Sequence, residues 1–223
     1  MIVAAGRSKR TGSIDKLWTP LADATGRSRP LLAYCLATFE RCPAVVRIVI
    51  VVAEEAIERT QALAEGEGWN KVCAVAAGGD RRQDSVRAGL ESLDRCEWVI
   101  VHDGARPMVT PALIEQGLRE AQDTGAACCA LPVPDTVKES DDAGRIVRTL
   151  NRSRLWLAQT PQTFRYDLLM QAHDRSQGEA TDDAALVEAL GVEVRLYQGS
   201  PRNLKVTTRD DLALAQALLS TST

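Results

Sequence analysis

Apolar positions in the first third of the chain alternate between the spacing of strands and the spacing of helices. Residues 45–52 form a nearly continuous run of β-branched side chains, which is typical of a strand covered on both faces. A segment with helical spacing precedes this run and ends near Pro43, and a second one follows over residues 53–65. Residues 72–76 give another expected strand. Counted from the apolar start at Met1, the order strand, helix, strand, helix, strand predicts an α/β fold.

The remaining two thirds of the chain continue this alternation. Further strands are expected at 98–101, 125–133 and 192–197, with a short one at 204–206. Helices are expected over 86–93, from 110, over 166–173, from 181, and from 208 to about 219. Thr110 before Pro111, and Thr208 three residues before Asp211, have the pattern of helix starts. The whole chain, residues 1–223, is therefore expected to form a single domain.

Residues 134–158 interrupt this pattern and are called the arm. Polar and apolar side chains alternate on both sides of the turn-forming residues 141–144, which predicts a β-hairpin that projects from the body. Such a hairpin exposes its edges and apolar side chains, including Val147 and Leu150. The arm is therefore expected to need a partner subunit.

Composition and charge narrow the class of protein. The chain has 223 residues, of which 45% are hydrophobic and 26% charged, as in an ordinary soluble globular protein. Its net charge of -3 gives no general attraction to nucleic acids or anionic membranes, so any anion site must be local. No apolar run is long enough to span a bilayer, and Met1 opens a strand and not a signal peptide. A cytoplasmic location is the resulting expectation.

The cysteines and histidines do not form a metal-binding or nucleophilic pattern. The six cysteines contain no Cys-x-x-Cys pair, so most are expected to be reduced core residues. His102 and His173 are far apart in sequence and have no serine or cysteine context, which argues against a hydrolase triad. We expect His102 at a strand end and His173 on an exposed helix surface.

The start of the chain carries the first candidate binding site. Small residues at positions 4–6 follow the first strand, and Arg7, Lys9, Arg10 and Lys16 come next. Small residues let a ligand approach the backbone amides, while long cations neutralise phosphate charge. The spacing matches neither a Walker loop nor a dinucleotide-binding turn. The segment fits a triphosphate site, although a solvated surface loop could have the same composition.

Two more strand ends carry polar or glycine-rich segments. After the strand at 72–76, residues 77–85 contain two glycines and Asp80, which has capping-box spacing to Gln83 and is expected to be a helix N-cap. Asp103 follows the strand at 98–101 and suits a metal ion or a ribose hydroxyl. Lys205, in the short strand at 204–206, either protects a sheet edge or points into a site.

Five segments taken together resemble one enzyme family, the 2-C-methyl-D-erythritol 4-phosphate cytidylyltransferases of the non-mevalonate isoprenoid pathway. They are Ala4-Ala-Gly-Arg-Ser-Lys-Arg-Thr-Gly with Asp15-Lys-Leu-Trp, Gly79-Asp-Arg-Arg-Gln-Asp-Ser, His102-Asp-Gly-Ala-Arg-Pro, Thr160-Pro-Gln and Asn203-Leu-Lys-Val-Thr. The likeness extends from about residue 2 to residue 219. Val3 and Asp15 depart from the family's pattern, in which proline is common at both positions.

The resemblance implies a fold, an activity and an assembly. The fold is a Rossmann-like nucleotidyltransferase fold, a mostly parallel twisted sheet with helices on both faces and a projecting β arm. The activity is transfer of CMP from CTP to methylerythritol phosphate, with magnesium as the cofactor. The assembly is a homodimer in which the arms are exchanged.

The resemblance also implies roles for individual residues. The cytidine would be held by Ala4, Ala5, Gly6, Gly79, Asp80 and Ser85. The triphosphate would be held by the catalytic cations Arg10, Lys16 and Lys205. The ribose and the metal ion would be held by Asp103. The methylerythritol phosphate would be held by Arg106, Thr136, Thr181 and the neighbouring subunit's Arg152.

The expected chemistry needs no general base. A phosphate monoester is already ionised at neutral pH, so its oxygen can attack the α phosphorus of CTP directly. The remaining task is to hold two polyanions together and neutralise transition-state charge. Two alternatives stay open at this point: a ribitol 5-phosphate cytidylyltransferase, and a nucleotide-sensing or scaffold module that has lost turnover. The presence of both Lys16 and Lys205 argues against the second alternative.

Overall fold

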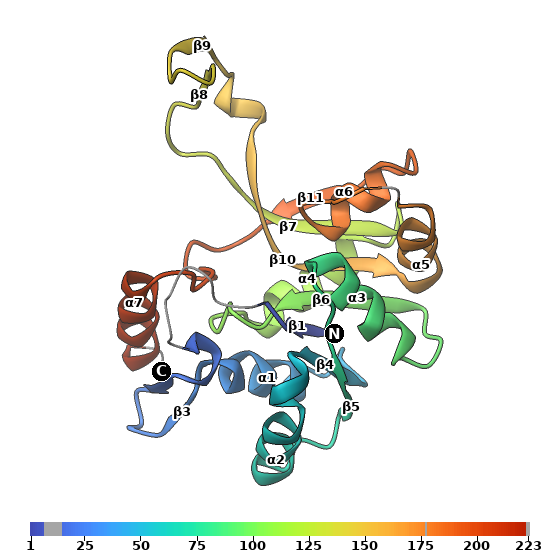
Figure 1. Ribbon diagram of the computed structural model, residues 1–223, viewed down its shortest axis with the longest axis vertical. Helices are drawn as coiled ribbons and strands as arrows, with labels where there is room; N and C mark the ends of the chain where they lie inside the picture. Colours follow the sequence, from blue (N-terminus) through green and yellow to red (C-terminus); the bar gives the residue numbers. More distant parts are fainter. Residues whose placement is uncertain (7–14, 177, 222–223) are drawn as a thin grey trace.

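The computed structural model describes residues 1–6, 15–176 and 178–221. At its centre lies a seven-stranded sheet in which a single strand, β10, runs antiparallel to its neighbours (Figure 1). In order across the sheet, the strands are β11 (Arg195–Gln198), β7 (Ala126–Pro132), β10 (Trp156–Arg165), β6 (Trp98–Asp103), β1 (Ile2–Ala4), β4 (Ile48–Val52) and β5 (Val72–Ala77). The predicted α/β fold with a mostly parallel sheet is confirmed.

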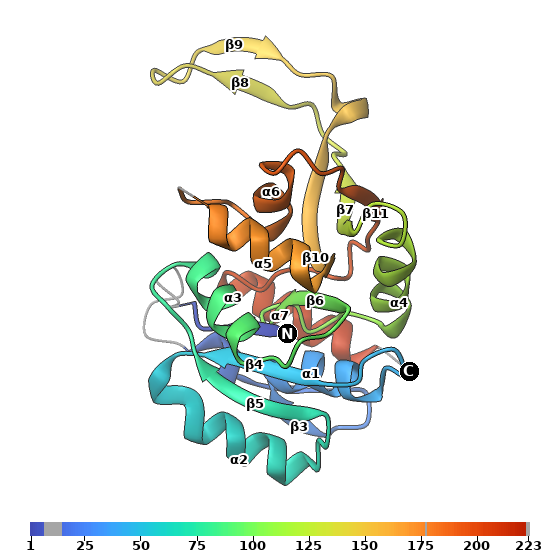
Figure 2. The ribbon, with the colours of Figure 1, turned by 90° about the vertical axis from the view of Figure 1, so that its right-hand side faces the viewer.

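Helices cover both faces of this sheet (Figures 1 and 2). They are α1 (Leu31–Arg41), α2 (Ile57–Glu67), α3 (Arg82–Glu91), α4 (Pro111–Glu120), α5 (Tyr166–Arg175), α6 (Asp183–Glu188) and α7 (Arg209–Ser220). Short 3-10 helices lie at η1 (Lys16–Trp18), η2 (Glu54–Ala56) and η3 (Arg152–Arg154). None of the helices within the described parts of the chain has the length and apolar character needed to cross a membrane.

The all-apolar sequence of β4 divides the core into two layers. All five of its residues are buried, and successive side chains of a strand point to opposite faces. Ile48, Ile50 and Val52 pack in the cluster that contains α1 and α7, whereas Val49 and Val51 pack in the cluster that contains α3, α5 and α6. The β-branched run therefore holds the two helical layers on one sheet, as its sequence predicts.

Helix starts agree with the sequence at two positions and differ at a third. Thr110 caps α4, and Thr208 and Asp211 form the predicted capping box of α7. The expectation that Asp80 caps α3 is wrong. The cap is Arg81, whose backbone N–H donates to the Asp84 carboxylate at 3.2 Å, so the helix begins one residue later than expected.

Three other expectations are corrected by the structure. Residues 204–206 form no strand; Val206 donates one backbone hydrogen bond, to Ala105, at 2.8 Å. The strand β10 was not expected, because four of its central residues are polar. His173 is not on an exposed surface: its side chain is 5% exposed and lies between α5 and α6.

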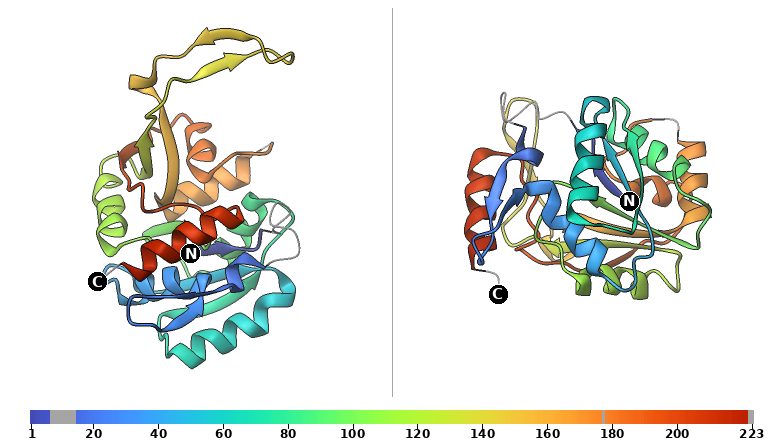
Figure 3. Two further views of the ribbon diagram at one scale, coloured as in Figure 1. Left: turned by 90° about the vertical axis from the view of Figure 1, so that its left-hand side faces the viewer. Right: turned by 90° about the horizontal axis from the view of Figure 1, so that it is seen from below.

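Two small antiparallel sheets complete the fold. One pairs β2 (Pro20–Ala22) with β3 (Ser28–Pro30) beside α7 (Figure 3). The other is the predicted hairpin of the arm, β8 (Lys138–Ser140) and β9 (Ile146–Thr149), which stands away from the body in Figures 1 and 2. The turn contains Gly144 at a φ of 77°, a conformation that favours glycine.

Candidate active site

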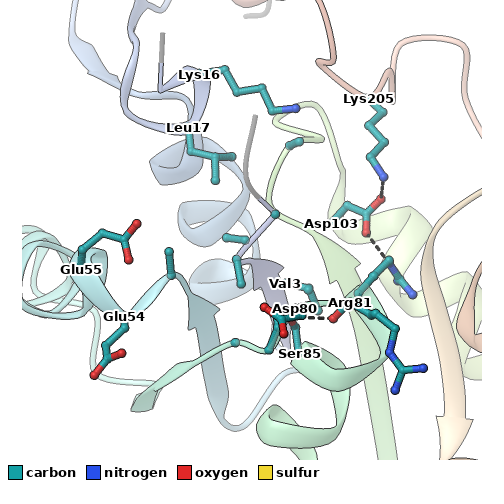
Figure 4. Close-up of a pocket in the computed structure, with 18 of the residues that line it drawn as sticks. Val3, Lys16, Leu17, Glu54, Glu55, Asp80, Arg81, Ser85, Asp103 and Lys205 are labelled. Atoms are coloured by element: carbon teal, nitrogen blue, oxygen red, sulfur yellow. Dashed lines mark hydrogen bonds and ion pairs between the residues drawn. The ribbon is translucent and has the colours of Figure 1, made fainter. Parts of the chain in front are cut away.

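A cavity of about 1050 Å³ opens at the carboxyl ends of β1, β4, β5 and β6 (Figure 4). In open α/β sheets this edge is where ligands usually bind. Three of the candidate segments, at the ends of β1, β5 and β6, meet here. The cavity is lined by Val3, Ala4, Ala5, Gly6, Lys16, Leu17, Ala53, Glu54, Glu55, Gly78, Gly79, Asp80, Arg81, Arg82, Ser85, Asp103, Ala105, Glu179 and Lys205.

Lys16 and Lys205 reach this cavity from opposite ends of the chain. Lys16 is held by η1, whose next two residues, Leu17 and Trp18, are buried in the core. Lys205 is held by Val206, which is fully buried beside β6. In Figure 4, Lys16 extends toward the side of the cavity that holds Lys205 and Asp103. The two lysines thus approach one space of a size suited to a polyanion.

Asp103 is the charged centre of the cavity wall. Its carboxylate lies 2.8 Å from Lys205 Nζ, 3.3 Å from Arg82 Nε and 3.9 Å from Arg106 Nε. Burial alone would raise the pKa of Asp103, but the charges of Arg82, Lys205 and Arg106 hold that pKa well below its usual range. Asp103 is therefore ionised at neutral pH.

Asp103 also meets the requirements of a shared magnesium ligand. Mg²⁺ commonly binds one or two carboxylates together with substrate phosphates, and Asp103 is an ionised carboxylate beside a cavity with two lysines. In the described residues, no three or more histidine, cysteine, aspartate or glutamate side chains are grouped to hold a metal ion. The residues thus fit a metal ion that is bound jointly by Asp103 and a phosphate-bearing ligand.

The glycines after β5 form the part of the wall nearest the start of the chain. A Cβ atom on Gly78 would overlap the Ala5 side chain and lie 2.7 Å from Ser85 Oγ, and one on Gly79 would lie 2.5 Å from Asp84 Cβ. Neither glycine has a positive φ. They are needed because β1, β5 and α3 approach each other closely, and the turn itself does not require them.

Comparisons with known proteins address the family directly. The family model described as 2-C-methyl-D-erythritol 4-phosphate cytidylyltransferase matches residues 1–221. The relative of that name from Dehalococcoides mccartyi strain CBDB1 is 44% identical over 219 residues, which are 98% of this chain and 94% of the relative. The one from Desulforamulus reducens is 46% identical over 226 residues, again 98% and 94% of the two chains. The chain belongs to the 2-C-methyl-D-erythritol 4-phosphate cytidylyltransferase family.

Solved structures agree with this family assignment. The 2-C-methyl-D-erythritol 4-phosphate cytidylyltransferase of Thermus thermophilus is 34% identical and has a TM-score of 0.77, with 97% of this chain and 96% of that chain covered. The 4-diphosphocytidyl-2C-methyl-D-erythritol synthase of Anaerococcus prevotii has a TM-score of 0.82 at 27% identity, with 98% and 93% covered. The resemblance seen in the sequence is thus confirmed for the family and for the fold of this cytidylyltransferase.

Most of the residues predicted to bind CTP line the cavity. They are Ala4, Ala5, Gly6, Lys16, Gly79, Asp80, Ser85, Asp103 and Lys205. Arg10 lies outside the described residues. Because the cavity gathers residues from β1, η1, the ends of β5 and β6, and the segment before α7, the sequence motifs converge in space. Their roles toward CTP stay predictions.

The residues predicted to bind methylerythritol phosphate do not line the cavity. Arg106 is buried and donates through Nη1 to the Asn203 carbonyl at 2.8 Å, so it supports the segment that carries Lys205. Thr136 and Arg152 are exposed on the arm, away from the body, and Thr181 is exposed just before α6. One copy of the cytidylyltransferase chain therefore does not gather the predicted acceptor residues.

Two kinds of cavity residue were missed in the sequence. Arg82 was quoted in a motif but given no role, and it contacts Asp103 and, at 2.7 Å, Asp183. Glu54 and Glu55, which follow β4, were given no role from the sequence; they line the cavity and are exposed. The signal for all three was their position, because each follows a strand whose carboxyl end reaches this edge of the sheet.

Replacing Gly78 by alanine is expected to destabilise the cytidylyltransferase by about 1–3 kcal/mol, because the added methyl group overpacks against Ala5 and Ser85. The Michaelis constant for CTP should rise as well, since Ala5 is pushed into the cavity. Urea denaturation and steady-state kinetics measure the two effects. Gly66→Ala is the control: a Cβ there meets no atom within 4 Å, so stability should be unchanged or slightly higher. Equal behaviour of the two variants would contradict the close-approach argument.

Proposed function

We propose that this chain transfers CMP from CTP to 2-C-methyl-D-erythritol 4-phosphate, releasing pyrophosphate, as a step of isoprenoid precursor synthesis. The family to which the chain belongs supports this reaction and this acceptor. The observation that carries the proposal is the convergence of Lys16 and Lys205 on one cavity beside an ionised aspartate. That arrangement suits a triphosphate whose charge grows during the reaction.

The proposed reaction is an in-line displacement at phosphorus. A phosphate oxygen of the acceptor forms a bond to the α phosphorus of CTP, while the bond from that phosphorus to the bridging oxygen of the β phosphate breaks. The bonding pair leaves with pyrophosphate. Lys16 and Lys205 would hold the phosphates in line and neutralise the charge on the leaving group. Arg10 is proposed to share this task.

Magnesium is proposed to bind Asp103 and the phosphates together. When bound, it would withdraw negative charge from the phosphate oxygens and so make the α phosphorus a better electrophile. Asp103 would orient this complex, because its backbone N–H donates to Thr160 Oγ1 at 3.0 Å and its carboxylate is fixed by Lys205 and Arg82.

The mechanism assigns no acid or base to a side chain. His102 is fully buried; burial lowers its pKa to about 4, so it is neutral at physiological pH. Its two ring nitrogens lie 3.1 Å from the Arg106 carbonyl and 3.1 Å from Thr160 Oγ1. These contacts hold the loop after β6, so the role of His102 is structural. A catalytic base is not needed, because the phosphate of the acceptor is already ionised.

The acceptor site is proposed to form between two copies of the chain. Thr136 and Arg152 lie on the arm, and the exposed side chains of the arm include Ile146 (65%) and Val147 (61%), which a second subunit would cover. Exchange of arms would bring Arg152 of one copy toward Arg106 and Thr181 of the other. The homodimer, like the cytoplasmic location expected from the sequence, stays a prediction.

Release of pyrophosphate tests the proposed function. The chain is incubated with magnesium, methylerythritol phosphate and each of CTP, ATP, GTP and UTP, and ribitol 5-phosphate replaces the acceptor in a parallel series. We expect pyrophosphate from CTP with methylerythritol phosphate and much less from every other pair. Faster release with ribitol 5-phosphate would favour the ribitol enzyme, and no release with any pair would favour a binding module without turnover.

Replacing Arg152 by alanine is expected to raise the Michaelis constant for methylerythritol phosphate by roughly ten-fold or more, because a charge-assisted bond to a phosphate is lost. Binding of CTP should be unchanged. Kinetics with each substrate varied in turn measure the two constants. Arg154→Ala, two residues away in the same η3 turn, is the control and should behave as the unmodified protein. Weaker CTP binding in the Arg152 variant would remove the arm from the proposed role.

A further inference from the structure

Arg82 connects Asp103 to a second buried carboxylate. Its Nε lies 3.3 Å from Asp103 Oδ1, and its Nη1 lies 2.7 Å from Asp183 Oδ2. Arg82 is the first residue of α3 and Asp183 the first residue of α6, so the contact joins two helices about 100 positions apart in the chain. The cavity wall is thereby tied to the layer formed by α3, α5 and α6.

Asp183 is itself enclosed on its other side. Its side chain is 1% exposed, and its second oxygen lies 3.6 Å from Nε2 of His173, whose side chain is 5% exposed. Burial alone would lower the pKa of Arg82, but Asp183 and Asp103 raise it above its ordinary value. The carboxylate of Asp183 thus lies between Arg82 of α3 and His173 of α5. Asp183 does not line the cavity.

The shape of the guanidinium group gives this contact a consequence. The group is a rigid planar fork that can bind a single carboxylate through two parallel N–H bonds. In this structure the fork is divided: one edge faces Asp103 and another faces Asp183. Without Asp183, Arg82 would be free to turn its whole fork toward Asp103. Asp103 would then be neutralised by a bidentate partner, and less of its charge would be available to a ligand.

We propose that Asp183, backed by His173, is a positioning residue that holds Arg82 divided between two carboxylates and so keeps Asp103 available to magnesium and CTP. This inference rests on the proposed role of Asp103 in nucleotide binding. Asp183 itself touches no substrate. Its effect passes through Arg82 alone.

Asp182, the residue before Asp183, provides a control that distinguishes this positioning role from a purely structural role in α6. Asp182 is the N-cap of the helix: its Oδ1 accepts the Ala185 backbone N–H at 3.0 Å, and its Oδ2 accepts Gln162 Nε2 at 2.8 Å. Asp183 is not needed for capping. Asp182→Asn therefore makes the same change of charge one residue away, in a side chain that still caps the helix.

The test compares Asp183→Asn, Asp182→Asn, Arg82→Lys and the Arg82→Lys/Asp183→Asn double variant. Binding of CTP is measured by titration calorimetry with and without magnesium and without acceptor, and kcat/KM is measured for both substrates. Loss of an outer carboxylate that orients a ligand-binding group typically costs ten- to hundred-fold. We expect Asp183→Asn to weaken magnesium-dependent CTP binding about ten-fold, with the Michaelis constant for the acceptor unchanged and Asp182→Asn within about two-fold of the unmodified protein.

The double variant decides whether Asp183 acts through Arg82. If it does, adding Asp183→Asn to Arg82→Lys should change CTP binding by less than about two-fold, because coupled residues are not additive. Full additivity, or CTP binding by Asp183→Asn equal to that of the unmodified protein, would overturn the inference. If Asp183→Asn alone does not fold, as judged by circular dichroism, the comparison of the double variant with Arg82→Lys carries the test: a difference in CTP binding of more than about two-fold between these two variants would overturn the inference.

Failure of this inference can be told apart from failure of the proposed function. If the unmodified chain releases pyrophosphate from CTP and methylerythritol phosphate while the Asp183 variant matches it, only the positioning role is wrong. If the unmodified chain neither binds CTP nor releases pyrophosphate, the proposed function is wrong, and the inference is overturned with it.

Discussion

Replacing Lys205 by alanine is expected to lower the turnover number by about two to three orders of magnitude, the usual cost of removing a single group that stabilises transition-state charge. Lys205 lies 2.8 Å from Asp103 and lines the same cavity as Lys16. Its ammonium group is thus positioned to contact both the proposed triphosphate and the carboxylate that we propose to bind magnesium. Lys16→Ala is expected to have an effect of the same size. Single-turnover measurements of pyrophosphate release with saturating CTP and acceptor give the rate of the chemical step directly.

Lys71→Ala serves as the matched control for both lysine variants. Lys71 directly precedes β5, at the opposite end of that strand from the cavity, and its Nζ donates to the Cys42 carbonyl at 2.8 Å. Its removal deletes the same charge and should leave turnover within about two-fold of the unmodified protein. Near-normal turnover in Lys16→Ala and Lys205→Ala, with both variants folded, would disprove their assignment to the triphosphate.

Replacing Asp103 by asparagine is expected to lower kcat/KM for CTP on the order of a hundred-fold. The change removes the carboxylate that we propose to bind magnesium, and it leaves Arg82, Lys205 and Arg106 facing a neutral group. The free energy of unfolding should also fall, by up to about 3 kcal/mol, because three cations lose one buried partner. Lys205 is 41% exposed, so solvent screens part of this loss.

The stability effect of Asp103→Asn should depend on pH in a defined direction. The pKa of Asp103 is lowered in the folded protein, so its contribution is complete above the unfolded pKa of about 4 and is lost as the pH falls toward the folded value. Urea denaturation should therefore give a larger difference between the variant and the unmodified protein at pH 7 than at about pH 3. A difference that grew in acid would contradict the ionised state assigned to Asp103.

The elements best predicted from the sequence are those whose stability comes from local or apolar signals. The run of β-branched residues at 45–52 identified β4, although only Ile48–Val52 form the strand. Thr208 and Asp211 marked the start of α7 because each side chain satisfies a backbone N–H of that first turn. The alternating arm residues gave the β8–β9 hairpin. In each case the residues that are recognisable in the sequence also form the contacts that stabilise the element.

The strand β10 could not be recognised from its residues alone. Gln159, Thr160, Gln162 and Thr163 are all buried, although polar residues of this kind usually mark loops. Their burial is offset by contacts with distant segments, for example from Gln162 Nε2 to Asp182 at 2.8 Å and from the Ala184 backbone N–H to Gln162 Oε1 at 3.1 Å. A proline within the run is a further signal against a strand. Only the folded chain reveals the partners that make this strand possible.

The sequence predicted which segments form the candidate site, but it did not predict the contacts between their side chains. The motifs identified Lys16, Asp103 and Lys205 as candidate site residues, and in the structure all three line one cavity. The contact of Arg82 with Asp183 was not predictable, because nothing in the sequence relates two helix starts so far apart. Neither the sequence nor the structure of a single copy of the chain tests the acceptor-binding role predicted for the residues of the arm.

The position of β10 between β6 and β7 bears on how the protein is made. When only the residues before β7 have left the ribosome, the four strands of the parallel β5-β4-β1-β6 part of the sheet have all been synthesised. The outer edge of β6 then carries unpaired backbone N–H and C=O groups. Residues 162–165, which pair with residues 98–101 of β6, are translated only after the intervening arm. During this interval the nascent chain is most exposed to mispairing with other strands, and chaperone protection would be most useful.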